Sequence, residues 1–128
     1  MNLITGWTLR QHIKTLHESA NLIGLDEVVE LVRQLAEALN YAHQQNMTHR
    51  DVKPDNILLK PTEAGGDVLD YTPILTDFGL AKITVAEEDM ATAEQPIGTY
   101  PYMSPEQCRA TALDGRTDIY SLGIVMYE

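Results

Sequence analysis

Apolar residues recur at intervals of three and four positions in the part of the chain that follows Asp26. This is the 3.6-residue period of a helix that buries one face. The segment contains neither Gly nor Pro up to Gln44, so the period predicts one long helix, with Asp26 as its N-cap. The apolar positions are Val28, Leu31, Val32, Leu35, Leu39 and Ala42.

Shorter elements are predicted on both sides of this helix. Thr8 and Gln11 have the spacing of a capping box, which predicts a short helix directly after Thr8. Residues 57–59 and 74–76 are short apolar runs typical of strands. The connection between them, residues 60–73, contains a Gly-Gly turn signal.

The last third of the chain is predicted to be mostly loop followed by a helix. Residues 77–104 show no period, and a loop of that length in a compact domain is usually functional. Pro105 is expected to open a short helix, and a last helix is expected from Asp118. Its apolar stretch, residues 119–127, is about half the length that spans a bilayer, so the helix is predicted to be buried. The aromatic residues expected to pack are Trp7, Tyr120 and Tyr127.

The charge and the cysteine content argue against some kinds of binding partner and indicate the cellular compartment. The formal net charge is -10, with 9 Lys and Arg against 19 Asp and Glu, which argues against nucleic-acid binding and against an anionic membrane surface. The single cysteine, Cys108, cannot form an intrachain disulfide and is expected to be a packed, inert thiol. Residues 1–9 lack the pattern of a signal peptide, so a cytoplasmic location is predicted.

Two polar clusters next to the strand-like runs carry the candidate chemistry. The first is H-R-D-V-K-P-D-N at residues 49–56, and the second is D-F-G at residues 77–79. In an extended loop Asp51 and Lys53 share a face, where a carboxylate can accept a proton while an amine balances negative charge. Asn56 and Asp77 are hard oxygen ligands of the kind that suits Mg²⁺ held together with phosphates. The clusters therefore indicate attack of a hydroxyl on a metal-bound phosphate.

These clusters resemble the catalytic loop and the metal-binding loop of eukaryotic-like (Hanks-type) protein serine/threonine kinases. Residues 98–106 resemble the end of the activation segment of that family, and residues 118–123 resemble the start of its buried central helix. Ser104 before Pro-Glu is a variant associated with bacterial members. The resemblance implies an α+β fold that is mainly α-helical, the C-terminal lobe of the protein kinase fold with a small β-hairpin at the active site.

By the same resemblance, Asp51 is the catalytic base and Lys53 contacts the transferred phosphate of ATP. Asn56 and Asp77 would bind Mg²⁺, and protein Ser/Thr hydroxyls would be the acceptors. Four further roles follow from the resemblance. Thr99, together with Lys53, favours Ser or Thr over Tyr as the acceptor, and Gly79 allows backbone dihedrals that other residues resist. The rings of His49 and Phe78 pack together, and Asp118 is a structural residue at the start of the central helix.

The resemblance also implies regulation through the arginine before the catalytic aspartate. In this family the arginine just before the catalytic aspartate pairs with a phosphate on the activation segment, because a guanidinium group binds phosphate through two parallel hydrogen bonds. Arg50 occupies that position. Thr92 is the candidate phosphosite, and Thr84 and Thr99 are the alternatives. Dimerisation of a parent kinase is a further expectation from the family.

Parts of the family pattern are missing from the 128 residues. They contain no G-x-G-x-x-G loop and no V-A-I-K lysine, and residues 1–6 resemble the hinge between the lobes. The chain is therefore expected to be a kinase domain truncated at both ends, running from the hinge to the start of the central helix. Without the small lobe it is expected to be inactive alone, and a membrane anchor could lie elsewhere in the parent. Glu106, without its usual arginine partner, is expected to be strained or protonated.

Two other functions are compatible with parts of the sequence. One is a non-catalytic binding module, a pseudokinase-like relic that docks onto another protein. The other is a small-molecule phosphotransferase with a related loop. Three histidines outside the clusters are interpreted as plain surface or packing residues: His12, His17 and His43.

Overall fold

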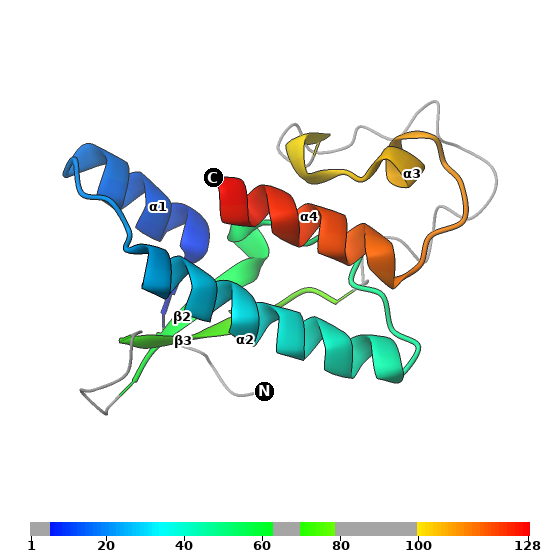
Figure 1. The fold of residues 1–128 in the computed structure, drawn as a ribbon, viewed down its shortest axis with the longest axis horizontal. Coiled ribbons are helices and arrows are strands. Elements are labelled where there is room, and N and C mark those ends of the chain that lie inside the picture. Colours follow the sequence, from blue (N-terminus) through cyan, green and yellow to red (C-terminus); the bar gives the residue numbers. More distant parts are fainter. Residues whose placement is uncertain (1–5, 63–69, 79–99) are drawn as a thin grey trace.

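The computed structural model describes residues 6–62, 70–78 and 100–128 and confirms a mainly helical α+β fold (Figure 1). A small antiparallel sheet lies beside the helices. In chain order the elements are β1 (Trp7–Thr8), α1 (Leu9–Glu18), α2 (Leu25–Gln44), the 3-10 turn η1 (Pro54–Asn56), β2 (Ile57–Pro61), β3 (Tyr71–Leu75), the 3-10 turn η2 (Tyr100–Tyr102), α3 (Pro105–Cys108) and α4 (Gly115–Tyr127).

The ends of α1 and α2 show how local sequence sets a helix start. The predicted capping box of α1 is confirmed, because the Gln11 N–H donates to Thr8 Oγ1 at 3.2 Å and the Thr8 N–H donates to Gln11 Oε1 at 2.9 Å. The prediction that Asp26 caps α2 is wrong, since the N-cap is Gly24, whose N–H donates to Glu27 Oε2. Asp26 instead lies in the first turn, where the helix dipole favours a negative charge.

Helix α4 begins three residues earlier than expected, because Asp114 caps it and accepts the Arg116 N–H at 2.9 Å. Only one face of α4 is buried, through Ser121, Leu122 and Val125. The predicted burial of this helix is therefore confirmed for one face only, and Tyr127 is 93% exposed. The other side chains expected to pack but found exposed are Trp7, Tyr120 and Cys108. Within the described ranges, no helix is both long and apolar enough to cross a bilayer.

The sheet confirms both predicted strands and extends them toward each other. Its strand order is β1-β2-β3, and β2 pairs with β3 from Ile57 opposite Leu75 to Pro61 opposite Tyr71. Pro73, expected in the connection, lies inside β3 opposite Leu59. A proline is tolerated there because β3 is an edge strand in the described sheet and one side of it needs no ladder donors.

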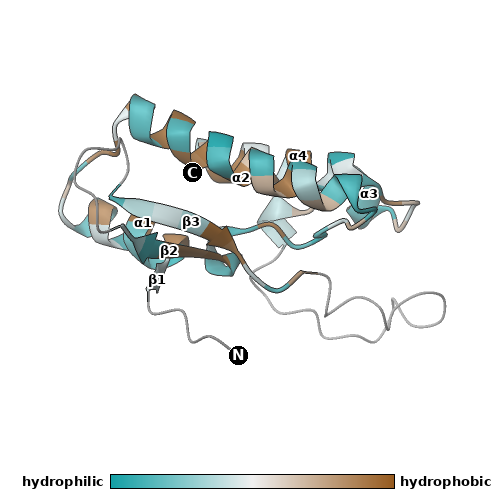
Figure 2. Ribbon diagram, turned by 90° about the horizontal axis from the view of Figure 1, so that it is seen from below, coloured by the Kyte–Doolittle hydropathy of each residue, from teal (hydrophilic) through white to brown (hydrophobic). Residues whose placement is uncertain are grey.

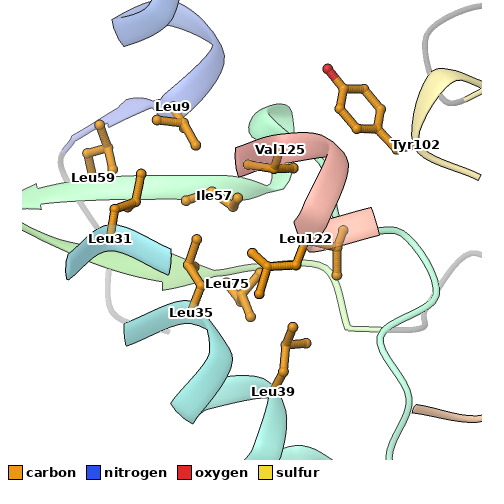
Figure 3. Packing of buried hydrophobic residues seen from close by; sticks show 11 residues of the cluster. Leu9, Leu31, Leu35, Leu39, Ile57, Leu59, Leu75, Tyr102, Leu122 and Val125 are labelled. Carbon is orange, nitrogen blue, oxygen red and sulfur yellow. The ribbon is translucent and has the colours of Figure 1, made fainter. Parts of the chain in front are cut away.

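The core lies where α2, α4 and the sheet meet. Helices α2 and α4 run side by side in opposite directions (Figure 1), and Figure 2 shows apolar and polar residues alternating along α2 as its two faces require. Burial of each of these leucines contributes about 1.5–3 kcal/mol to the stability of the fold. The cluster therefore holds α2 and α4 together with the sheet. The buried side chains labelled in Figure 3 are Leu9 of α1, Leu31, Leu35 and Leu39 of α2, Ile57 and Leu59 of β2, Leu75 of β3, Tyr102 of η2, and Leu122 and Val125 of α4.

A polar cluster around Arg10 ties α1 to three later parts of the chain. The Arg10 guanidinium donates to Asp55 in η1 at 3.4 Å, to Glu128 and to the Tyr102 hydroxyl. The Tyr102 hydroxyl in turn donates to Glu128. Burial and the Glu128 carboxylate raise the pKa of Tyr102, so its hydroxyl keeps its proton and remains a donor. Helix α1 is therefore bound to both η1 and η2.

Substitution of two glycines by alanine is expected to change the free energy of unfolding in opposite directions. Gly123→Ala is expected to raise the free energy of unfolding by about 0.5–1 kcal/mol, because helical alanine loses less backbone entropy and nothing lies within 4 Å of the added Cβ. Gly6→Ala is expected to lower it by about 1–3 kcal/mol, because the added Cβ would lie 2.5 Å from the Leu59 carbonyl oxygen. Urea unfolding followed by circular dichroism measures both, and equal shifts would contradict the close approach at Gly6.

Candidate active site

A buried carboxylate on α4 organises the segment that carries Asp51. This segment, residues 45–53 between α2 and η1, is called the Asp51 loop below. Asp118 has no exposed surface, and its Oδ2 accepts the His49 N–H at 2.8 Å while its Oδ1 accepts the Arg50 N–H at 2.7 Å. Burying a carboxylate is costly unless such charge-assisted bonds satisfy it. The predicted structural role of Asp118 is thus given a geometry: it fixes two consecutive backbone groups of the Asp51 loop.

His43 at the end of α2 is a third partner of this carboxylate. Its Nε2 lies 2.7 Å from Asp118 Oδ2, and an ionised carboxylate can only accept, so Nε2 carries the proton. Gly115 leaves room for the ring, because a Cβ at that position would lie 2.7 Å from His43 Nδ1. The interpretation of His43 as a plain surface or packing residue is therefore wrong. Helical spacing could not reveal a contact with a residue 75 positions later.

The residues predicted to carry the chemistry meet around the Asp51 carboxylate. Lys53 Nζ donates to Asp51 Oδ2 at 2.9 Å, which confirms that the two side chains share a face. Asn56 Nδ2 donates to the same oxygen at 3.0 Å and to the Asp51 carbonyl at 2.9 Å. The other carboxylate oxygen, Asp51 Oδ1, is buried and has no hydrogen-bond partner in the described part of the chain. One oxygen is thus held by two donors and the other is left as an acceptor.

His49 joins the Asp51 loop to the end of β3. Its ring has no exposed surface, and its Nε2 lies 2.8 Å from the Thr76 carbonyl oxygen. A carbonyl only accepts, so Nε2 is the protonated nitrogen, and Nδ1 can accept the Asp51 N–H at 3.3 Å. The ring also packs on Phe78, with centroids 4.6 Å apart, as predicted. One neutral imidazole therefore orients the backbone at Asp51 and the chain before Asp77.

The hairpin brings the backbone at Asp77 close to that at Asn56. The Thr76 N–H donates to the Asn56 carbonyl at 2.9 Å at the end of the hairpin. Of the two predicted Mg²⁺ ligands, Asn56 belongs to this pair and Asp77 directly follows Thr76. Asp77 is exposed and has a φ of 60°. Among the described residues, no group of three or more His, Cys, Asp or Glu side chains could hold a metal ion by itself. The available donors, one amide oxygen and one carboxylate, fit a cation that also takes oxygen ligands from phosphate.

Glu106 differs from its prediction. Its carboxylate accepts the Thr117 hydroxyl at 2.9 Å. Its own backbone N–H and this hydroxyl lower the pKa of Glu106, so the expected uptake of a proton is wrong. The remaining predicted positions lie outside the described residues: Gly79, Thr84, Thr92, Thr99 and the hinge-like residues 1–5.

Both the sequence and the fold are similar to those of known proteins. The family model described as protein kinase domain matches residues 1–128. A probable serine/threonine-protein kinase of Clostridium acetobutylicum is 38% identical over 128 residues, which are 100% of this chain and 18% of that protein. The serine/threonine-protein kinase PknB of Mycobacterium leprae is 36% identical over 128 residues, again 100% of this chain and 19% of PknB.

A solved structure has a similar fold. The PknI kinase domain of Mycobacterium tuberculosis matches with a TM-score of 0.70 and 31% identity, over 98% of this chain and 41% of that one. The chain thus spans less than a fifth of the length of these two curated relatives and about two-fifths of the solved domain.

Replacing Asp118 tests whether its carboxylate holds the Asp51 loop. Both oxygens accept backbone N–H groups, so an asparagine in either orientation would place its NH₂ against a donor. Asp118→Asn is expected to lower the free energy of unfolding by about 1.5–3 kcal/mol, the range for hydrogen bonds to charged groups.

The matched control is Asp114→Asn on the same helix. Asparagine is as good an N-cap as aspartate, so this change is expected to be nearly neutral. Urea unfolding measures both variants. Equal losses would contradict the special role of Asp118.

Proposed function

Because this chain belongs to the protein kinase family, we propose that it forms the catalytic-loop part of a protein serine/threonine kinase. Its parent would transfer the γ-phosphate of ATP to Ser or Thr hydroxyls of proteins. The observation that carries the proposal is the Asp51 carboxylate: Lys53 and Asn56 hold one oxygen, and the other is buried with no hydrogen-bond partner among the described residues. Residues 1–128 would then run from the hinge through the catalytic loop and activation segment to the start of the central helix.

Asp51 would act as the general base. Its Oδ1 needs a donor, and a substrate hydroxyl supplies one in the position from which its proton is removed. Lys53 and Asn56 keep the carboxylate from rotating, because both donate to Oδ2. A positioned base of this kind contributes about 10²–10⁴ in rate.

Lys53 and the metal ligands would handle the phosphate charge. The ammonium group of Lys53 lies 2.9 Å from the base and would contact the transferred phosphate. Asn56 and Asp77 would hold Mg²⁺ and bind ATP through it, as their oxygen donors allow. When bound, Mg²⁺ neutralises the negative charge of the phosphates.

Regulation and location complete the proposal. Arg50 would pair with a phosphate on the activation segment, with Thr92 as the first candidate acceptor and Thr99 favouring Ser/Thr substrates. The single cysteine, which cannot form an intrachain disulfide, supports a cytoplasmic location for this part of the protein. Dimerisation of the parent stays a prediction.

The activity is tested in a chimaera in which this chain replaces the aligned 128 residues of PknB. The chimaera is expected to phosphorylate a generic Ser/Thr protein substrate with MgATP. Asp51→Asn is expected to lower its kcat by about 10²–10⁴, the contribution of a general base. The isolated chain, which contains neither a glycine-rich phosphate loop nor a V-A-I-K lysine, is expected to transfer none.

The matched control is Asp55→Asn. Asp55 is an exposed carboxylate in η1 that contacts Arg10, and its substitution is expected to leave kcat within about twofold. Circular dichroism confirms that each variant folds. A folded chimaera whose activity does not depend on Asp51 would refute the proposed base, and a folded inactive one would favour a non-catalytic binding module.

Metal binding has its own readout in the isolated chain. Mn²⁺, a paramagnetic substitute for Mg²⁺, is expected to broaden the side-chain amide NMR signal of Asn56 much more than that of Asn40, an exposed asparagine on α2. Asp77→Asn is expected to reduce this broadening because it removes the only charged ligand assigned to the site. Equal broadening of the two asparagines would mean that the metal assignment is wrong.

A further inference from the structure

Gln107 makes one more hydrogen bond than its place in a helix cap requires. Pro105 opens α3 as expected, and Ser104 caps it through a capping box. The Gln107 N–H donates to Ser104 Oγ at 3.3 Å, and Gln107 Oε1 accepts the Ser104 N–H at 3.0 Å. These bonds use only the oxygen of the side-chain amide. The nitrogen, Nε2, donates to the Arg50 carbonyl at 2.7 Å, across 57 positions of the sequence.

The capping box makes Gln107 a fixed donor. Ser104 has no exposed surface, and Gln107 is itself partly buried. Because Oε1 is already bound to Ser104, the orientation of the amide plane is set by α3. Any movement of α3 therefore moves the Nε2 donor with it.

The acceptor is the carbonyl of a strained residue. Arg50 has a φ of 66°, in the left-handed region that residues with a side chain rarely adopt. Such a conformation persists only where surrounding contacts determine it. Here Asp118 of α4 holds the Arg50 N–H at 2.7 Å, and Gln107 of α3 holds the Arg50 carbonyl at the same distance.

The peptide group that Gln107 binds is the one that precedes Asp51. Its carbonyl belongs to Arg50, and its N–H belongs to Asp51 and points to His49 Nδ1 at 3.3 Å. Both ends of this peptide plane are therefore hydrogen-bonded. The tilt of the plane sets the direction in which the Asp51 side chain leaves the backbone.

We propose that Gln107 is a positioning residue that couples α3 to the orientation of Asp51 through the Arg50–Asp51 peptide. The inference rests on the proposed function, since it assigns Asp51 the role of base. Among the described residues, the hydrogen bonds of the Gln107 side chain go to Ser104 and to the Arg50 carbonyl, so Gln107 would act on Asp51 through the backbone.

The chain contains its own matched control for this residue. Gln11 occupies the same capping-box position on α1, with Oε1 accepting the Thr8 N–H at 2.9 Å. Gln11 is exposed and is not hydrogen-bonded to the Asp51 loop. Identical substitutions at Gln107 and Gln11 therefore separate the loss of the bond to Arg50 from an effect on a helix cap.

The first test is Gln107→Glu in the PknB chimaera. The glutamate keeps an acceptor for the Ser104 N–H but turns a second oxygen toward the Arg50 carbonyl. We expect kcat to fall roughly five- to tenfold near neutral pH, the equivalent of one hydrogen bond, with the KM for ATP unchanged. Gln11→Glu should leave kcat unchanged.

A pH series distinguishes positioning from a general loss of structure. When it is protonated, the carboxyl introduced by Gln107→Glu can donate to the Arg50 carbonyl, so the ratio of variant to wild-type kcat should rise as the pH falls from about 8 to about 5. Taking the ratio removes the effects of pH on the assay that are common to both proteins. Gln107→Met, which has no donor at any pH, should show the loss without the recovery.

NMR on the isolated chain makes the outcome independent of the kinase assay. In the Gln107→Glu variant the Arg50 carbonyl and Asp51 amide shifts should titrate together with the new carboxyl, and in Gln11→Glu they should not. If these shifts respond while the wild-type chimaera is inactive, the proposed function fails and the coupling stands. If the shifts do not respond, or they respond while kcat is unaffected, the positioning role is overturned.

Discussion

The buried carboxylate of Asp118 is the interaction on which the rest of the site depends. A charge without exposed surface is tolerated because three donors from elsewhere in the chain converge on it: the backbone N–H groups of His49 and Arg50 and the ring of His43. These donors belong to the end of α2 and the middle of the Asp51 loop, while the acceptor belongs to α4. The packing of α2 on α4 and the geometry of the loop therefore require each other.

Hydrogen bonds to several other elements hold the Asp51 loop, although the loop has no regular structure. Arg50 adopts a left-handed backbone, and each of its two peptide groups is bound by a different element. His49 adds a link from the loop to the end of β3 through one neutral imidazole. Asp51 thus extends from a backbone bound to α3, α4 and β3, although its own segment has no regular structure. The general base proposed at Asp51 would benefit from such a support, because its acceptor oxygen would be held in a defined position.

Much of the fold followed from local chemistry. The apolar period predicted α2, the Thr8–Gln11 spacing predicted the cap of α1, and Pro105 marked the start of α3, because each depends on residues within a few positions of one another. The errors have equally local reasons. The N-cap of α2 is Gly24, whose N–H donates to Glu27, and Asp26 lies in the first turn. Helix α4 begins after its own N-cap, Asp114, three residues before the expected position. The exposure of Tyr127 could not be seen in an apolar run, since composition does not say which face is covered.

The sequence by itself determined the family and the residue types of the site, because the H-R-D-V-K-P-D-N and D-F-G segments carry their chemistry within a few consecutive positions. It also determined that Asp51 and Lys53 share a face, which follows from the alternation of an extended chain. Only the tertiary structure decided which groups hold that chemistry in place. Gln107 and Asp118 contact the Asp51 loop across 57 to 69 positions of sequence, and His43 contacts Asp118 across 75. Such contacts form when helices pack, and no local pattern of residues encodes them.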